Sequence, residues 1–135
     1  MFKEKPVVLI VDDNKEIVEA IANFLQVIPD FKDKIFVKTA HYGKQAMQII
    51  EQGSVDMVYS DIDMPNGGEG FDLAEDVKAF NQNILVVLNS GNVDYKKEEM
   101  PDSVDGYVRG FTDKKTLFTY INQVREKVTK LQEGI

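Results

Sequence analysis

VDMVYSDIDMP, residues 55–65, is the stretch that decides the fold. Its first part, from Val55 to Ser60, is a mainly apolar run of strand length that delivers Asp61 to the rim of a sheet. Pro65, with the glycines at 67 and 68, keeps the following loop from becoming helix. Taken alone, an aspartate after a strand is more often a turn former than a reactive group, because its side chain bonds nearby backbone amides. A second observation is needed to decide between the two roles.

A second apolar run ends in the same kind of residue. Residues 7–11 read VVLIV, typical of a strand buried on both faces of a parallel sheet, and Asp12 and Asp13 follow at once. Neighbouring parallel strands lie about 4.8 Å apart, so if these two runs pair in one sheet, the acidic pair should meet Asp61 at one edge. Three carboxylates this close repel one another unless one is protonated or a cation binds. We therefore expect a divalent ion, Mg²⁺ or Mn²⁺, at this edge.

Apolar runs alternate with segments of helical period along the chain. Strands are expected at 7–11, 35–39, 55–60, 84–88 and 106–108, and helices from an Asp13 cap to about 28, at 43–52, at 71–80 and at 113–131. This alternation predicts an α/β fold, a doubly wound five-stranded parallel sheet of order 2-1-3-4-5 in a flavodoxin-like three-layer α/β/α sandwich. Residues 92–103 are polar and interrupted by Pro101, so a fourth helix there should be among the least stable parts. We expect a single domain over residues 1–135, with its core at about 7–131.

The composition excludes several function classes. The chain has no cysteine and one histidine, His41, so thiolate sites and histidine metal clusters are excluded and any metal must have oxygen ligands. The formal charge of -7 argues against nucleic acid as a partner, because binding to phosphates needs many Lys and Arg contacts. No apolar run has membrane-spanning length, and the first six residues are too short and charged for a signal peptide. We expect a cytoplasmic protein without a membrane partner.

Four motifs, each at the end of an expected strand, carry a family resemblance. They are the acidic pair Asp12-Asp13, the D-x-x-M-P sequence from Asp61 to Pro65, Ser90 before Gly91, and Tyr107. In this order they resemble the response-regulator receiver domain of two-component signalling, including its single-domain chemotaxis members. The resemblance spans roughly residues 7–131, which is nearly the whole chain.

The resemblance implies a phosphorelay function centred on Asp61. This carboxylate would accept a phosphoryl group from a histidine kinase, a phosphotransfer protein or a small phosphodonor. Implied metal ligands are Asp13 and Asp61 directly, the main-chain carbonyl of Asp63, and Asp12 through water. Ser90 and Tyr107 would then bias the face built from helix four, strand five and helix five toward a partner-binding state. The chain would be a signalling protein without an output domain, not a turnover enzyme, and the resemblance also allows a homodimer.

The sequence departs from the family after the fifth strand. Residues 106–111 read GYVRGF, without the family's Lys-Pro, and the run is one residue short. Arg109 could replace the lysine in charge, but a planar guanidinium is not equivalent to an ammonium group. We expect phosphorylation with a more loosely coupled switch, because Gly110 constrains the loop less than proline would. Asp63 adds a fourth carboxylate, which should disfavour anionic donors or influence attack by water on an acyl phosphate.

Two other functions and several structural roles stay open. A haloacid-dehalogenase-like phosphatase would use Asp61 as nucleophile and Asp63 as acid, and a pseudo-receiver would dock partners without being phosphorylated. Structural roles are also open for individual residues: a helix cap for Asp13, rim acids for Asp12 and Asp63, a turn for Ser90, core for Tyr107, a surface ion pair for Arg109 and a loop position for His41.

Overall fold

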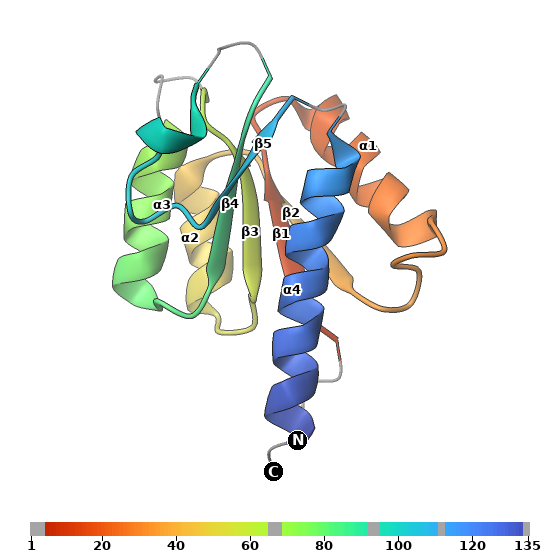
Figure 1. Cartoon of the computed structure of the whole chain (residues 1–135). Coiled ribbons are helices and arrows are strands. Elements are labelled where there is room, and N and C mark those ends of the chain that lie inside the picture. Colours follow the sequence, from red (N-terminus) through yellow and green to blue (C-terminus); the bar gives the residue numbers. More distant parts are fainter. Residues whose placement is uncertain (1–4, 65–68, 92–94, 111–112, 134–135) are drawn as a thin grey trace.

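A single parallel sheet of five strands forms the centre of the molecule (Figure 1). The computed structural model describes residues 5–64, 69–91, 95–110 and 113–133. The strands are β1 (Val7–Val11), β2 (Phe36–Ala40), β3 (Met57–Asp61), β4 (Leu85–Ser90) and β5 (Gly106–Arg109). They lie in the order β2-β1-β3-β4-β5, which confirms the predicted topology. All neighbouring strands run parallel, so their carboxyl ends share one edge.

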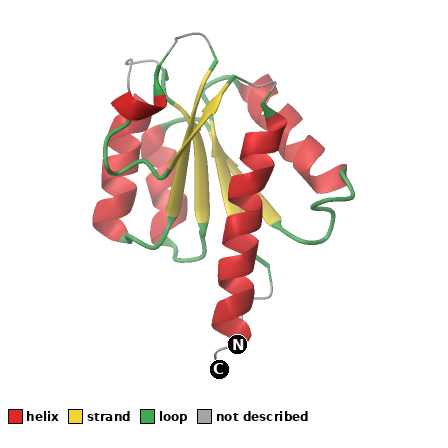
Figure 2. Ribbon diagram, in the orientation of Figure 1, coloured by secondary structure: helices red, strands yellow, loops and turns green. Residues whose placement is uncertain are grey.

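Four α-helices cover the two faces of the sheet (Figures 1 and 2). They are α1 (Lys15–Val27), α2 (Gly43–Glu51), α3 (Glu69–Phe80) and α4 (Lys114–Glu133). Helices α2 and α3 lie on one face, and α1 and α4 lie on the other. This is the predicted three-layer sandwich. No helix among the described residues is long and apolar enough to cross a bilayer.

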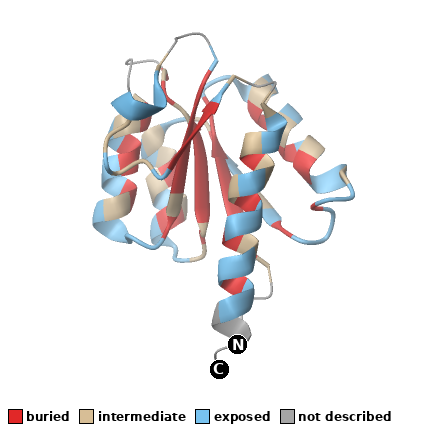
Figure 3. Cartoon of the chain, viewed as in Figure 1, coloured by how far each residue is buried: buried red, intermediate tan, exposed pale blue. Residues whose placement is uncertain are grey.

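Side chains of β1 divide between two cores, which explains its unbroken apolar sequence. Val7, Leu9 and Val11 pack on the side of α2 and α3, whereas Val8 and Ile10 pack on the side of α1 and α4. Figure 3 shows the buried sheet between helices whose outer faces are exposed. Helical spacing predicts inward positions that are buried in the structure: Leu25, Ala46, Ile50, Leu73, Ala74, Val77, Leu117, Ile121, Val124 and Val128. Other positions predicted to face inward are only half-buried: Ile17, Ile21, Phe24, Ile28, Ile49 and Phe118. Helix α1 buries Val18 and Ala22 instead, so the spacing identified most of the core but misplaced the buried stripe of α1.

The cap of α1 is Asn14, so the prediction of Asp13 at this position is wrong. The Asn14 side chain accepts hydrogen bonds from the backbone N–H groups of Glu16 and Ile17, at 3.0 and 3.2 Å. The Asn14 N–H in turn donates to the Asp12 carboxylate at 2.9 Å. The two aspartates thus occupy the turn between β1 and α1, and the helix begins after a separate capping residue.

The prediction of a helix between β4 and β5 is wrong for the part of this segment that the structure describes, residues 95–105. Here the chain forms one 3₁₀ turn, η1 (Lys97–Glu99), with no buried residue. Only Tyr95, Met100 and Val104 pack partly against the core, which is too few for the apolar stripe of a helix. Pro101 follows Met100, whose extended backbone ends the turn. The expected face of helix four, strand five and helix five is therefore made of segment 95–105, β5 and α4.

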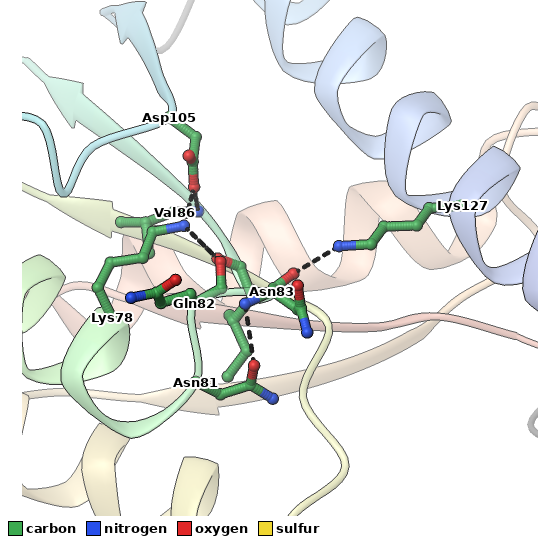
Figure 4. Close-up of polar contacts among 8 residues, drawn as sticks. Lys78, Asn81, Gln82, Asn83, Val86, Asp105 and Lys127 are labelled. Atoms are coloured by element: carbon green, nitrogen blue, oxygen red, sulfur yellow. Dashed lines mark hydrogen bonds and ion pairs between the residues drawn. The ribbon is translucent and has the colours of Figure 1, made fainter.

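A polar network joins α3, α4 and the turn before β4, as Figure 4 shows. The Lys78 ammonium forms an ion pair with Asp105 at 2.5 Å and donates to the Ile84 carbonyl at 2.7 Å. Asp105 also accepts a hydrogen bond from the Val86 N–H at 2.7 Å, and Lys127 donates to the Asn83 carbonyl at 2.9 Å. These contacts hold the amino ends of β4 and β5, at the opposite edge of the sheet from the aspartates.

Candidate functional site

Three aspartates meet at the carboxyl edge of the sheet, as the sequence predicted. Asp12 and Asp13 follow β1, Asp61 ends β3, and these strands are neighbours with Val11 beside Ser60. Each aspartate offers one carboxylate oxygen, and these oxygens all lie within 4.8 Å of one another. Asp12 is buried, Asp61 is half-buried and Asp13 is exposed, so the cluster opens to solvent on one side. A set of hard oxygen donors of this kind fits Mg²⁺.

The cluster is electrostatically unfavourable without a cation. Burial raises the pKa of Asp12 to about 6, although the hydrogen bond from the Asn14 N–H acts in the opposite direction. Burial also raises the pKa of Asp61 to about 6, and the negative charge of Asp12 is the next largest cause. Both groups are therefore ionised at neutral pH, but against the preference of their surroundings. A divalent ion would relieve this repulsion directly.

Gly70 allows α3 to pack closely against the backbone of Asp61. The Gly70 N–H donates to the Ile62 carbonyl at 3.0 Å. A Cβ atom on Gly70 would lie 2.4 Å from the Asp61 carbonyl oxygen and 2.7 Å from the Ile62 Cα. Backbone atoms cannot move away as a flexible side chain could, so this position requires glycine. The amino end of α3 thus fixes the main chain that carries the candidate acceptor.

Asp63 lies beside Asp61 and is held from two directions. Its N–H donates to the Asp61 carboxylate at 3.3 Å, and its own carboxylate accepts a hydrogen bond from the Tyr95 hydroxyl at 3.1 Å. The Tyr95 ring packs edge-on against Phe71 of α3, with ring centroids 5.6 Å apart. The fourth carboxylate is therefore a partnered group at the rim of the site. Ligation of a metal by its main-chain carbonyl stays a prediction.

Asn89, which the sequence analysis did not select, is the strand partner of Asp61. β4 runs two residues beyond its predicted end, to Ser90, and Asn89 is 2% exposed. Its amide nitrogen donates to the Tyr59 hydroxyl, and its amide oxygen accepts no hydrogen bond within the described part of the chain. Because side chains alternate along a strand, Ser90 lies on the opposite face of β4 from Asn89. The switch role of Ser90 stays a prediction.

Tyr107 and Arg109 occupy different environments on β5. Tyr107 is 9% exposed and belongs to the core on the α2 and α3 side, and its hydroxyl has no hydrogen-bond partner among the described residues. Arg109 is exposed and lies beside Ser90 in the strand register. Gly110 follows with a left-handed φ of 79°, and its N–H donates to the Ser90 carbonyl at 3.0 Å. The switch role of Tyr107 and the replacement of the family lysine by Arg109 stay predictions.

His41 lies next to the acidic cluster, although the sequence analysis gave it no role. Its ring Nδ1 is 3.4 Å from the Asp12 carbonyl oxygen. The main-chain N–H of His41 donates to the Gln45 side-chain oxygen at 2.8 Å. The predicted topology could have placed His41 beside the cluster, because β1 and β2 are parallel neighbours and His41 follows β2 as Asp12 follows β1.

Two parts of the predicted motifs, Pro65 and Phe111, lie outside the described residues.

Comparison with known families decides the identity. The sequence pattern of the response regulator receiver domain matches residues 8–122. The chain belongs to this family. Receiver domains are components of two-component systems, so the match confirms the resemblance drawn from the aspartates and the D-x-x-M-P sequence. It also argues against a haloacid-dehalogenase-like phosphatase.

Solved structures of receiver domains share the fold of this one. A receiver domain protein from Clostridium thermocellum is similar with a TM-score of 0.77 and 23% identity, and the match covers 93% of this chain and 98% of that chain. The response regulator TrrA from Thermotoga maritima, solved in complex with Mg(2+)-BeF, matches with a TM-score of 0.74 and 22% identity over 88% of this chain and 98% of that chain. TrrA in complex with the histidine kinase ThkA matches with a TM-score of 0.73 and 22% identity over 88% of this chain and 97% of that chain.

Proposed function

We propose that this receiver domain accepts a phosphoryl group on Asp61 in a Mg²⁺-dependent reaction. The observation that carries the proposal is the convergence of three carboxylates within 4.8 Å at the carboxyl edge of the sheet. Asp13 and Asp61 would bind the ion directly, with the Asp63 main-chain carbonyl, and Asp12 would act through water. The Mg(2+)-BeF complex of TrrA supports this assignment. Mn²⁺ would suit the same oxygen ligands.

Phosphoryl transfer to Asp61 exchanges one bond to phosphorus for another. An Asp61 carboxylate oxygen forms the new bond to phosphorus while the bond from phosphorus to the donor breaks, and the donor group leaves with the electron pair. For a phosphohistidine donor the leaving group is an imidazole nitrogen. When bound, Mg²⁺ supplies positive charge that neutralises the phosphoryl oxygens. Asp61 attacks as the ionised form, which its pKa of about 6 permits at neutral pH.

In this proposal the phosphoryl donor and the target that receives the signal are both proteins. The complex of TrrA with ThkA supports a histidine kinase as the donor, and a phosphotransfer protein would present the same phosphohistidine. Output passes to a protein target through the face formed by segment 95–105, β5 and α4. Ser90 and Tyr107 take part in the switch, and Asn89 joins them as the residue in register with Asp61. The protein acts by being phosphorylated and dephosphorylated, and it does not turn over a substrate.

Intact mass spectrometry after incubation with acetyl phosphate tests the proposal. The expected result is an adduct of one phosphoryl group on the wild type with Mg²⁺ and none with EDTA. Asp61→Asn should abolish the adduct, whereas Asp76→Asn, which changes an exposed aspartate of α3, should leave it unchanged. A wild type without any adduct, even when incubated with a phosphorylated histidine kinase, would instead identify a pseudo-receiver.

A further inference from the structure

One hydrogen bond joins the acidic site to the segment between β4 and β5. The Tyr95 hydroxyl donates to the Asp63 carboxylate at 3.1 Å, across a sequence separation of 32 residues. The main-chain N–H of Asp63 contacts the Asp61 carboxylate at 3.3 Å. Tyr95 therefore acts on the same short turn that carries the phosphoacceptor and one predicted metal ligand.

Within the described part of the chain, segment 95–105 has few other attachments near the site. Its 3₁₀ turn contains no buried residue, and its internal hydrogen bonds are local, from Glu99 to Lys96 and from Met100 to Lys97. At its far end the Asp105 N–H joins the Val86 carbonyl at 2.8 Å, close to the opposite edge of the sheet. At the near end Tyr95 supplies both the bond to Asp63 and an edge-on ring contact with Phe71. Tyr95 thus anchors the near end of the segment.

We propose that Tyr95 is a positioning residue that couples cation binding at the aspartates to docking of segment 95–105. Both events restrict the turn around Asp63, one through the metal ligands and the other through the Tyr95 hydroxyl. A turn already ordered by one event loses less conformational freedom in the other, so the two events favour each other. The inference rests on the proposed metal site and adds the route by which occupancy of that site reaches the output face.

Coupling of this kind is reciprocal and can be measured from both ends. Removing the Tyr95 hydroxyl should weaken Mg²⁺ binding, and Mg²⁺ should in turn order the segment. Tyr95→Phe is the suitable change, because phenylalanine keeps the ring that packs on Phe71 and loses only the donor. Tyr120→Phe is the matched control: it removes the same group from a ring that lies against Gly106, at the amino end of β5.

The first measurement is the dissociation constant of Mg²⁺ by titration calorimetry at pH 8. We expect Tyr95→Phe to weaken Mg²⁺ binding about fivefold, the lower end of typical coupling between sites, and Tyr120→Phe to leave it unchanged. Asp63→Asn keeps a side-chain oxygen as acceptor, so adding Tyr95→Phe to it should weaken binding again. In an Asp63→Ala background the acceptor is gone, and Tyr95→Phe should have no further effect.

The second measurement is amide hydrogen exchange in segment 95–105. Mg²⁺ should slow this exchange in the wild type and in Tyr120→Phe, but not in Tyr95→Phe. Wild-type Mg²⁺ affinity in Tyr95→Phe, or an equal effect of that change in the Asp63→Ala background, would overturn the inference. Failure of the wild type to bind Mg²⁺ at all would overturn the proposed function itself, and it would be seen before any variant is compared.

Discussion

Replacing Asp61 by asparagine should stabilise the protein when no metal is present. In the folded state the pKa of Asp61 is about 6, against an ordinary value of 3.8. A folded pKa above the unfolded one means that the group favours folding in its protonated form. The stability that protonated Asp61 contributes is fully present below pH 3.8, is lost as the pH rises through about 6, and is absent at pH 8. Asparagine stays neutral at every pH, so Asp61→Asn should recover this stability at pH 8.

The expected gain in the free energy of unfolding follows from the shift in the Asp61 pKa. Two pKa units correspond to about 3 kcal/mol, and solvent screening of this half-buried carboxylate reduces the expected gain to about 1–2 kcal/mol. Asparagine also keeps an oxygen that can accept the hydrogen bond from the Asp63 N–H. The gain should therefore come mainly from removing a charge that burial disfavours, with the repulsion from Asp12 as the second cause.

Urea unfolding followed by circular dichroism, in EDTA, measures the free energy of unfolding at pH 8 and at pH 4. We expect Asp61→Asn to be more stable than the wild type at pH 8, with a much smaller difference at pH 4. Adding Mg²⁺ should stabilise the wild type more than the variant, because the variant lacks one ligand charge. A variant that is less stable than the wild type at pH 8 without metal would refute the reasoning.

Four further substitutions test other contacts. Gly70→Ala places a Cβ 2.4 Å from the Asp61 carbonyl oxygen, so it should lower the free energy of unfolding by about 1–3 kcal/mol and slow phosphorylation by acetyl phosphate. Asn14→Ala removes the cap of α1 and should lower that free energy by about 1 kcal/mol in the same urea assay, while the phosphoryl adduct still forms. Asp105→Ala leaves Lys78 and the Val86 N–H without this acceptor, and thermal unfolding should show a loss of about 1–3 kcal/mol. Asp63→Asn should change the lifetime of the phosphoryl adduct, and equal lifetimes in the two proteins would exclude an effect of this charge on attack by water.

The sequence was sufficient for the sheet and for the acidic cluster. Strands buried on both faces must be almost wholly apolar, as Val7–Val11 is, so the strands could be inferred from apolar runs. Their order followed from the flavodoxin-like arrangement that alternating strands and helices favour. Once the order was known, parallel pairing required residues that follow β1 and β3 to share an edge. Convergence of Asp12, Asp13 and Asp61 followed from this topology without any information about side-chain contacts.

Other features depend on contacts that local patterns do not contain. The end of β4 was placed two residues early, because Asn89 and Ser90 are polar and an apolar run was used to define the strand. Pairing with Asp61 makes Asn89 part of the strand in spite of its polarity. The bond between Tyr95 and Asp63 joins residues 32 positions apart, and neither residue has a local signal for it. The absence of a helix in the described residues 95–105 was indicated beforehand only by low apolar content and Pro101.

The 3₁₀ turn at Lys97–Glu99 also bears on fidelity among signalling pathways. A helix uses its main-chain amides and carbonyls internally and shows a partner only its side chains. A segment with only short turns leaves more of those main-chain groups available to a partner protein than a helix does. If the proposed output face is used, a target protein that binds a helical surface would not find a helix at residues 95–105, which should reduce cross-talk with receivers that present one there.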